Sequence, residues 1–219
     1  MGIANYVRPN VPPDVVKKLG AAGLTNLLQL MADSYRDLKE MGFVQADSRE
    51  NTITEEWLVQ ISARCQQKPT SSYVPIQQKE DSTKAKSRGN PPTVDFCFRH
   101  RFDNRVYFGA ECKLLDEGSK KYLEAYLSEK EGIGRFLDGR YSSHSGAGAM
   151  VGYVRSGSCA KVAESLEIAI QKLAGTPKLN KSQVLSNFDQ LYESLHTREC
   201  PINEFRCFHL LFGFDCITV

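Results

Sequence analysis

Hydrophobic residues recur every three or four positions near the start of the chain, and this spacing predicts helices. One continuous apolar stripe over 24–41 is made of Leu24, Leu27, Leu28, Met31, Tyr35, Leu38 and Met41. Gly42 should end this helix, and a shorter helix before it should end at Gly20. The start of the chain is therefore expected to form a helical arm.

A third helix is expected over 48–65. Its buried face should consist of Glu50, Ile53, Trp57 and Ile61, which share helical spacing. The start of this helix stays open, because a capping-box spacing begins once at Asp47 and once at Thr52. Residues 66–92 are polar, contain proline and are rich in Lys and Arg, which predicts a long loop with a short strand at 73–76.

Apolar runs predict strands in the second half of the chain. Residues 93–101 and 105–115 should form a hairpin, and 146–154 and 205–214 should form buried strands. Part of 118–137 and the amphipathic stretches 160–174 and 182–195 should be helical. This order predicts an α/β sandwich in which helices flank a central mixed β-sheet. We divide the chain into a helical N-terminal arm, 1–46, and an α/β domain, 47–219.

Composition bears on the binding partners and the cellular location of the protein. The chain of 219 residues is 41% hydrophobic and carries a net charge of +2, so any basic surface must come from local clustering. Seven cysteines without a Cys-x-x-Cys pair indicate reduced thiols. No run approaches the roughly 18 apolar residues of a membrane span, and no signal peptide is recognisable. We expect a cytoplasmic protein without membrane contact.

The aromatic residues of the hairpin select its register. A three-residue loop at 102–104 places Phe96 opposite Ala110 and Phe98 opposite Phe108. These pairs form one coherent apolar face. A two-residue turn would instead set Asp95 beside Cys112 and split that face, so we predict the three-residue loop.

This register gathers three charged side chains, because Asp95 lies opposite Glu111 and strand alternation puts Lys113 on the same side. Two such carboxylates raise each other's pKa unless a cation lies between them. Mg²⁺ prefers oxygen ligands and is commonly held by one or two carboxylates, waters and a substrate phosphate. Lys113 could then stabilise charge on that phosphate or orient an attacking water. The alternative is a surface ladder of salt bridges on the open hairpin face.

The stretches PPTVDF, 91–96, and GAECKL, 109–114, resemble the motif of the PD-(D/E)XK nuclease superfamily. The resemblance implies a restriction-endonuclease-like fold for 47–219 and hydrolysis of DNA that depends on Mg²⁺, with Mn²⁺ able to substitute. It implies Asp95 and Glu111 as metal ligands and Lys113 as the catalytic lysine. The chain departs from the family pattern in that two residues separate Pro92 from Asp95.

Members of this superfamily often add a glutamate from the preceding helix. Glu50 best matches that position as a further catalytic and metal-binding residue, because it shares the face of Ile53 and Trp57. Glu55 and Glu56 would point elsewhere and are the fallback candidates.

Basic residues outside the motif are candidates for contact with the nucleic-acid backbone. They are Lys84, Lys86 and Arg88 in the long loop, and Arg135 and Arg140 in a later segment that also carries aromatic residues. The alternative is that these side chains are only solvated. The segment 126–154 is similar to restriction-like nucleases of bacterial antiphage systems, which implies a role in restriction or phage defence.

The expected partner is DNA, with RNA as the alternative. Because a duplex needs two cuts, we expect a homodimer or a subunit of a multi-protein defence complex, with an ATPase or helicase on another chain. A rival hypothesis is a catalytically inactive subunit of the same fold that binds nucleic acid or scaffolds such a complex. A zinc site at His196, Cys200, Cys207 and His209 is disfavoured, because their spacing fits no familiar finger.

Overall fold

The structure is a computed structural model that describes residues 13–67, 73–80, 93–100, 107–199 and 202–215. Its helices are α1 (Pro13–Glu40), α2 (Glu50–Gln67), α3 (Lys120–Leu127), α4 (Gly134–Leu137) and α5 (Cys159–Ile170). Its strands are β1 (Tyr73–Glu80), β2 (Thr93–His100), β3 (Tyr107–Asp116), β4 (Ala147–Ser156), β5 (Asn180–Lys181), β6 (Leu191–Thr197) and β7 (Glu204–Gly213).

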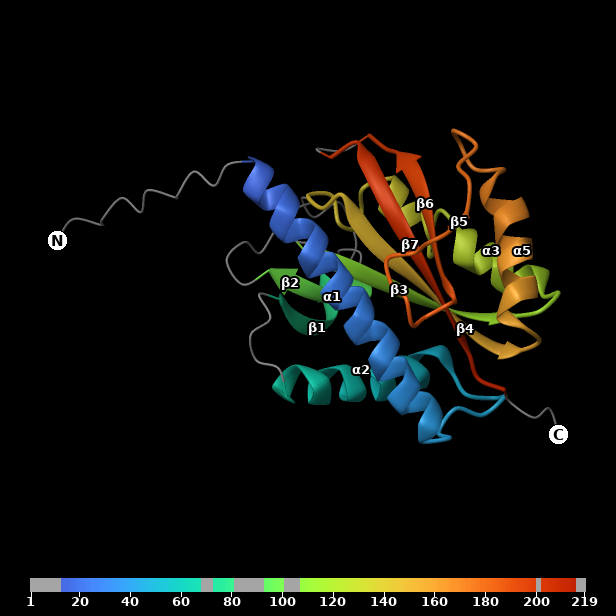
Figure 1. The fold of residues 1–219 in the computed structure, drawn as a ribbon. Helices are drawn as coiled ribbons and strands as arrows, with labels where there is room; N and C mark the ends of the chain where they lie inside the picture. The colour runs from blue at the N-terminus through green and yellow to red at the C-terminus, as the bar shows by residue number, and fades with distance from the viewer. Residues whose placement is uncertain (1–12, 68–72, 81–92, 101–106, 200–201, 216–219) are drawn as a thin grey trace.

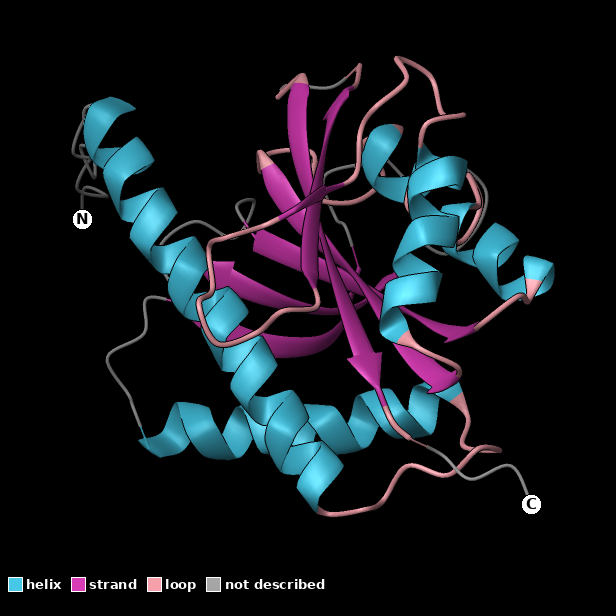
Figure 2. Ribbon diagram, turned by 45° about the vertical axis from the view of Figure 1, so that its right-hand side comes forward, coloured by secondary structure: helices cyan, strands magenta, loops and turns pink. Residues whose placement is uncertain are grey.

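The described strands form one mixed sheet of seven, in the order β1-β2-β3-β4-β7-β6-β5. The central strands β3, β4 and β7 run parallel, and antiparallel pairs flank them on both sides. Helices α1 and α2 cover one face of the sheet, and α3 and α5 cover the other (Figures 1 and 2). The predicted α/β class, with a mixed sheet flanked by helices and a helical N-terminal region, is therefore confirmed.

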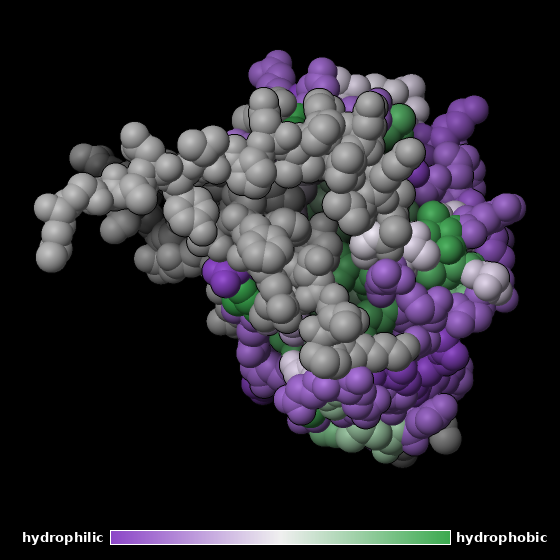
Figure 3. Space-filling model, turned by 60° about the vertical axis from the view of Figure 1, so that its left-hand side comes forward, coloured by the Kyte–Doolittle hydropathy of each residue, from purple (hydrophilic) through white to green (hydrophobic). Residues whose placement is uncertain are grey.

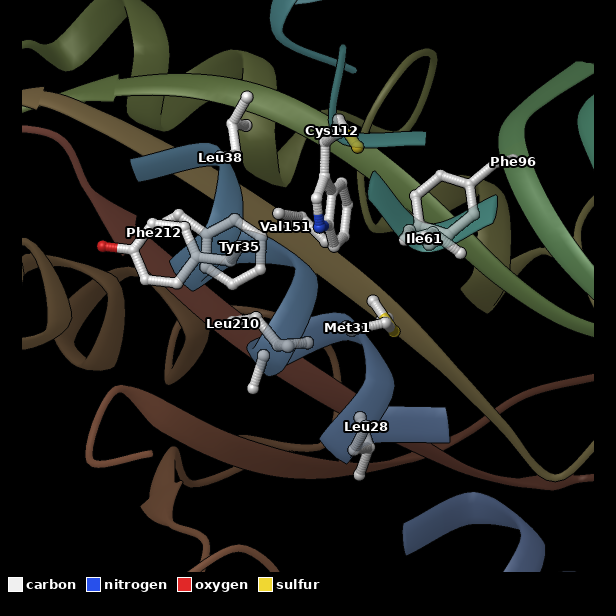
Figure 4. Packing of buried hydrophobic residues seen from close by; sticks show 14 of the residues in the cluster. Leu28, Met31, Tyr35, Leu38, Ile61, Phe96, Cys112, Val151, Leu210 and Phe212 are labelled. Atoms are coloured by element: carbon white, nitrogen blue, oxygen red, sulfur yellow. The ribbon is translucent and has the colours of Figure 1, made fainter. Parts of the chain in front are cut away.

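Burial on both faces explains why the central strands read as apolar runs. On the α1 and α2 face, Tyr35 stacks on Phe212 with ring centroids 4.1 Å apart (Figure 4). Trp57 meets Phe96 and Phe212 edge-on, at 5.0 Å and 4.9 Å. Each such large side chain stabilises the fold by about 1.5–3 kcal/mol through burial. This packing fixes α2 on the sheet and with it the start of α2 at Glu50.

The hairpin register is confirmed from Phe96 to Arg99, but the predicted pair of Asp95 with Glu111 does not form, because the pairing of β2 with β3 begins at Phe96 and Ala110. Phe96 pairs with Ala110 and Phe98 with Phe108. The predicted loop at 102–104 lies outside the described residues. The strands predicted at 73–76, 146–154 and 205–214 are present, and β1 extends beyond its prediction to Glu80.

The division of the N-terminal arm into two helices was wrong, because α1 runs unbroken from Pro13 to Glu40 through Gly20. A glycine inside a helix costs about 1 kcal/mol relative to alanine but keeps its backbone hydrogen bonds. Gly42, with φ of +62°, follows the helix end as predicted. The buried stripe of α1 packs in the same hydrophobic cluster as α2 and the sheet, and the boundary at residue 46 stays a prediction.

The helix predicted over 182–195 was also wrong, since this stretch holds irregular backbone followed by β6. Leu185 and Phe188 are buried from that irregular segment in the cluster that α1 and α2 cover. The spacing of these apolar residues matches that of a helix face, but here it reflects only which side chains are buried. From Leu191 onward the residues pair with β7, the next strand in the chain, so the structure has a β6–β7 hairpin where part of a helix was predicted.

Hydrophilic residues dominate the described surface on the face that Figure 3 shows. The large hydrophobic side chains exposed in the described residues are spread over several parts of the chain: Met41 and Phe43 between α1 and α2, Val59 on α2, Ile168 on α5, Leu195 on β6 and Ile202 before β7. Within the described ranges, no helix combines the length and apolarity needed to cross a membrane.

Candidate active site

Strands β2 and β3 part beyond the pair formed by Phe96 and Ala110, which opens one edge of β3. The backbone N–H groups of Cys112 and Leu114, two residues apart, point to this same edge. Cys112 N–H donates to Asp95 Oδ2 at 2.7 Å, and Leu114 N–H donates to Glu50 Oε2 at 3.0 Å. The two carboxylates therefore accept the hydrogen bonds that carbonyl oxygens of a neighbouring strand would otherwise accept. These bonds hold Asp95 and Glu50 at the open edge of β3.

Lys113 lies between the carboxylates and uses all three of its ammonium donors. Its Nζ lies 3.0 Å from Glu111 Oε1, 3.3 Å from Glu50 Oε1 and 2.9 Å from the carbonyl oxygen of Cys112. Burial lowers the pKa of Lys113, but the surrounding carboxylates outweigh this and leave its pKa above the ordinary value. Lys113 is thus a buried ammonium in a fixed position.

Glu111 is 2% exposed, and its Oε2 is buried without a hydrogen-bond partner in the described structure. Burial first, and then the charge of Asp95, raise the pKa of Glu111 to about 7. Burial also raises the pKa of Asp95 and of Glu50, although Lys113 opposes both shifts. The cluster therefore carries more negative charge than Lys113 alone balances, and it favours a further cation or proton.

A segment that follows α3 brings a second cation to the cluster. Arg135 of α4 places Nη1 at 3.9 Å from Glu111 Oε1. The same nitrogen donates to the hydroxyl of Tyr141, which in turn donates to the carbonyl oxygen of Thr93 at 2.6 Å. Tyr141 thereby ties this segment to β2, two residues before Asp95.

The structure brings together five predicted site residues: Glu50, Asp95, Glu111, Lys113 and Arg135. Arg140 does not join them, because its guanidinium donates to the carboxylate of Asp138 and to the carbonyl of Glu129. Lys84, Lys86 and Arg88 lie outside the described residues. Glu55 of α2 is exposed and Glu56 partly so, and Glu50 is the glutamate of this helix that contacts Lys113.

Sequence reasoning missed Arg198, which follows β6 and is 4% exposed. Its guanidinium donates to carbonyl oxygens of Phe136, Tyr141, Ser142 and Ser145, and so holds the segment that carries Arg135. An isolated arginine between two predicted elements gives no local signal for such a role. Tyr141 is one of several aromatic residues in the same segment, and no pattern in the sequence singles it out.

The donor set suits a hard divalent cation. Glu50 already uses both carboxylate oxygens, whereas Asp95 Oδ1 and Glu111 Oε2 accept no hydrogen bond from the described residues. In the described ranges, no three His, Cys, Asp or Glu side chains are arranged as a ready metal-binding group. Mg²⁺ needs only one or two protein carboxylates, because waters and substrate oxygens complete its shell. Asp95 and Glu111 supply that number.

The two histidines considered for zinc take part in a different arrangement. The Nε2 atoms of His196 and His209 lie 2.7 Å and 2.8 Å from Ser194 Oγ. Tyr126 Oη lies 3.0 Å from His209 Nδ1. These four side chains form a buried hydrogen-bonded chain, the Tyr126–His196 chain. Cys200 lies outside the described residues.

Comparison of the chain with models of protein families, with curated proteins and with solved structures finds no match. Functional inference therefore depends on the chemistry of the carboxylate cluster.

Proposed function

We propose that this protein is a metal-dependent nuclease of restriction-endonuclease-like fold that hydrolyses DNA phosphodiester bonds. The observation that carries the proposal is the convergence of Asp95, Glu111 and Lys113 on one side of the open edge of β3. The order of helix, antiparallel strands, helix and parallel strand around this edge supports it. The motif resemblance implies the same order.

Burial argues against a surface ladder of salt bridges. Glu111 and Lys113 are 2% and 9% exposed, so both groups have given up most of their hydration. The loss of hydration alone, without the compensating ion pair, destabilises a fold by on the order of several kcal/mol per ion. Perturbed carboxylates of this kind concentrate at functional sites, which favours a chemical role.

In the proposed site, Asp95 Oδ1 and Glu111 Oε2 would hold Mg²⁺ or Mn²⁺. When bound, the ion would polarise the phosphoryl oxygen and lower the pKa of the attacking water. Glu50 is also implied as a ligand by the resemblance. We assign it first to positioning Lys113, because it would have to release Lys113 or Leu114 to reach an ion.

The protein's own groups would position the reacting phosphate. A water oxygen forms the new bond to phosphorus, the bond from phosphorus to the leaving oxygen breaks, and the water's proton passes to solvent while the leaving oxygen gains one. The ammonium of Lys113, fixed by Glu50 and Glu111, stabilises the negative charge that develops on the phosphate. The low exposure of this group strengthens its electrostatic effect.

The motif resemblance extends the proposal to restriction or phage defence. The protein would act as a homodimer or within a multi-protein complex, with an ATPase or helicase on a separate chain. Because the site lies on a single chain, cleavage of one strand needs no second copy. Cleavage of both strands would use two copies or two encounters.

The proposal is tested by incubating supercoiled, linear and single-stranded DNA with the protein and Mg²⁺ or Mn²⁺. We expect cleavage that EDTA abolishes and that Asp95→Asn and Lys113→Met each reduce at least 100-fold, roughly the effect of losing one electrostatic group. Matched controls are Asp189→Asn and Lys120→Met, both at exposed positions of the same residue type. Intact DNA with the wild-type protein under every condition would refute the proposal.

Single-stranded RNA in the same assay separates the two substrates. Faster cleavage of RNA than of DNA would reverse the assigned substrate while keeping the assigned chemistry.

A further inference from the structure

Arg135 is the second cation at the carboxylate cluster. Glu111 Oε1 lies between Lys113 Nζ at 3.0 Å and Arg135 Nη1 at 3.9 Å. The longer distance exceeds that of a hydrogen bond, so the charge of Arg135 lies beside Glu111 without a direct bond to it. Its side chain is 26% exposed, so Arg135 is only partly buried.

Tyr141 sets the orientation of this guanidinium. Its hydroxyl accepts from Arg135 Nη1 and donates to the carbonyl of Thr93, which matches the one donor and the acceptor capacity of a phenol. Arg135 Nε donates to the carbonyl of Lys130. Nη2 has no hydrogen-bond partner in the described part of the chain. Nε and Nη1 are therefore anchored, and Nη2 is left to bind something else.

Arg198 fixes the segment that carries Arg135 and Tyr141 to the rest of the fold. It donates to the carbonyls of Phe136, Ser142 and Ser145 at 3.0, 2.9 and 2.6 Å from inside the molecule. Ser142 has φ of +51°, a conformation that costs about 1 kcal/mol or more for a residue with a side chain. Buried hydrogen bonds hold the segment in this shape, so Arg135 and Tyr141 are positioned before any ligand arrives.

Arg140 on the same segment provides the contrast. Its Nε lies 2.5 Å from Asp138 Oδ2, and its side chain is 31% exposed. The exposure of the two arginines is similar, but Arg140 is neutralised by an adjacent carboxylate and bonds to the backbone of Glu129. Exposure therefore does not distinguish them, whereas proximity to Glu111 does.

We propose that Arg135, oriented by Tyr141, binds a non-bridging oxygen of the phosphodiester that lies at Asp95 and Glu111. This inference rests on the proposed nuclease function and assigns its phosphate-binding residue. A guanidinium held at Nε and Nη1 suits this contact, because the rigid plane fixes the direction of the Nη2 N–H groups that would donate to the phosphate oxygen. Lys113 and Arg135 would then approach the phosphate from the two sides of Glu111.

The first test measures cleavage by Arg135→Ala, Arg135→Lys and Tyr141→Phe. We expect kcat/KM to fall about 100-fold for the alanine variant and about 10-fold for each of the others, because lysine keeps the charge and phenylalanine keeps the ring. Arg140→Ala should lower kcat/KM less than about 3-fold, as expected for a peripheral charge. Arg36→Ala, at an exposed position on α1, should leave it unchanged.

A second measurement separates phosphate contact from a merely structural role. DNA with stereochemically pure phosphorothioate linkages replaces one non-bridging oxygen by sulfur, a weaker hydrogen-bond acceptor. One diastereomer should slow the wild-type protein about 10-fold more than it slows Arg135→Ala, because that variant has already lost the contact. Equal slowing of both proteins by both diastereomers would overturn the inference, as would equal activity of Arg135→Ala and Arg140→Ala.

Failure of the proposed function gives a different result. If the wild-type protein leaves DNA intact, the nuclease proposal fails, and anisotropy of a labelled duplex in EDTA then tests the phosphate contact alone. Weaker binding by Arg135→Ala than by Arg140→Ala would support the contact. Equal binding by the two variants would overturn it.

Discussion

Two buried polar networks in this molecule differ in their charge balance. The cluster at β3 places three carboxylates near Lys113, two of them bonded to it, and burial raises the pKa of Glu111 to about 7. In the Tyr126–His196 chain, burial instead lowers the pKa of His196 to about 4 and of His209 to about 3, so both rings stay neutral. Neutral hydrogen-bonded groups are inexpensive to bury, whereas unbalanced carboxylates are not.

We interpret this difference as one between a structural network and the proposed functional one. Ser194 joins two neutral rings, and in this chain His196 Nδ1 is the buried atom that lacks a partner among the described residues. At the cluster, the buried atom without a partner there is a carboxylate oxygen, Glu111 Oε2. An orphaned carboxylate oxygen beside a second acid is a place for a cation. We therefore expect substitutions in the carboxylate cluster to reduce activity and substitutions in the Tyr126–His196 chain to reduce stability.

The largest expected effect comes from Glu111→Gln. We expect cleavage to fall about 1,000-fold, because a carboxylate that would hold the ion is lost. The same variant should unfold at a higher temperature at pH 8, since it no longer buries a carboxylate whose pKa is raised to about 7. Cleavage assays and thermal unfolding measure the two effects. A loss of stability together with retained cleavage would reverse the functional assignment of this network.

Glu50→Gln tests the positioning of Lys113. The amide oxygen can still accept from Leu114 N–H, but it offers no charge to the ammonium, so we expect kcat/KM to fall about 30-fold. Glu55→Gln on the same helix is the matched control, because Glu55 is exposed. Equal effects of the two substitutions would mean that the helix contributes no specific carboxylate.

Ser194→Ala should act on stability alone. It removes the hydroxyl that joins the two imidazoles and leaves both Nε2 atoms without this partner, at a cost of about 2 kcal/mol in the free energy of unfolding. Urea unfolding measures this loss, and the exposed Ser186→Ala should change it by less than about 0.5 kcal/mol. Loss of cleavage without loss of stability would mean that the Tyr126–His196 chain has a functional role and not a structural one.

The smallest expected effect is a difference in pH dependence. The folded pKa values of His196 and His209, about 4 and about 3, lie below the unfolded value of 6.5, so stability falls as the pH drops below 6.5. Glu111 acts in the opposite direction, because its folded pKa of about 7 exceeds the ordinary value of 4.5 and stability rises as the pH drops from 7 toward 4.5.

Glu111→Gln removes only the second of these responses. Between pH 7 and pH 5 we expect the variant to lose on the order of 1 kcal/mol more unfolding free energy than the wild-type protein. Urea unfolding at both pH values measures the difference. Parallel curves for the two proteins would show that Glu111 does not take up a proton on folding in this range.

The hairpin and its charged residues were predictable from sequence because large aromatic side chains decide the register. A shift by one residue would have turned Phe96 and Phe98 away from the apolar face. Glu50 was predictable for a related reason, since it precedes Trp57 by two helical turns and Trp57 is buried against the sheet. Strong local periodicity thus placed the cluster.

Contacts that join distant segments were not predictable in this way. Arg198 satisfies carbonyls more than fifty positions earlier in the chain. The segment 182–190 carries apolar residues at helical spacing but buries them from irregular backbone. Local pattern reports which side chains are buried, and only the assembled fold decides what backbone carries them.

The central claim is that Asp95 and Glu111 share a divalent ion beside Lys113. Anomalous diffraction from crystals grown with Mn²⁺ tests it most directly. We predict a manganese peak about 2.1 Å from Asp95 Oδ1 and Glu111 Oε2, and its loss in crystals of Asp95→Asn. A structure with Mn²⁺ absent from this position, or bound equally well after that substitution, would contradict the claim.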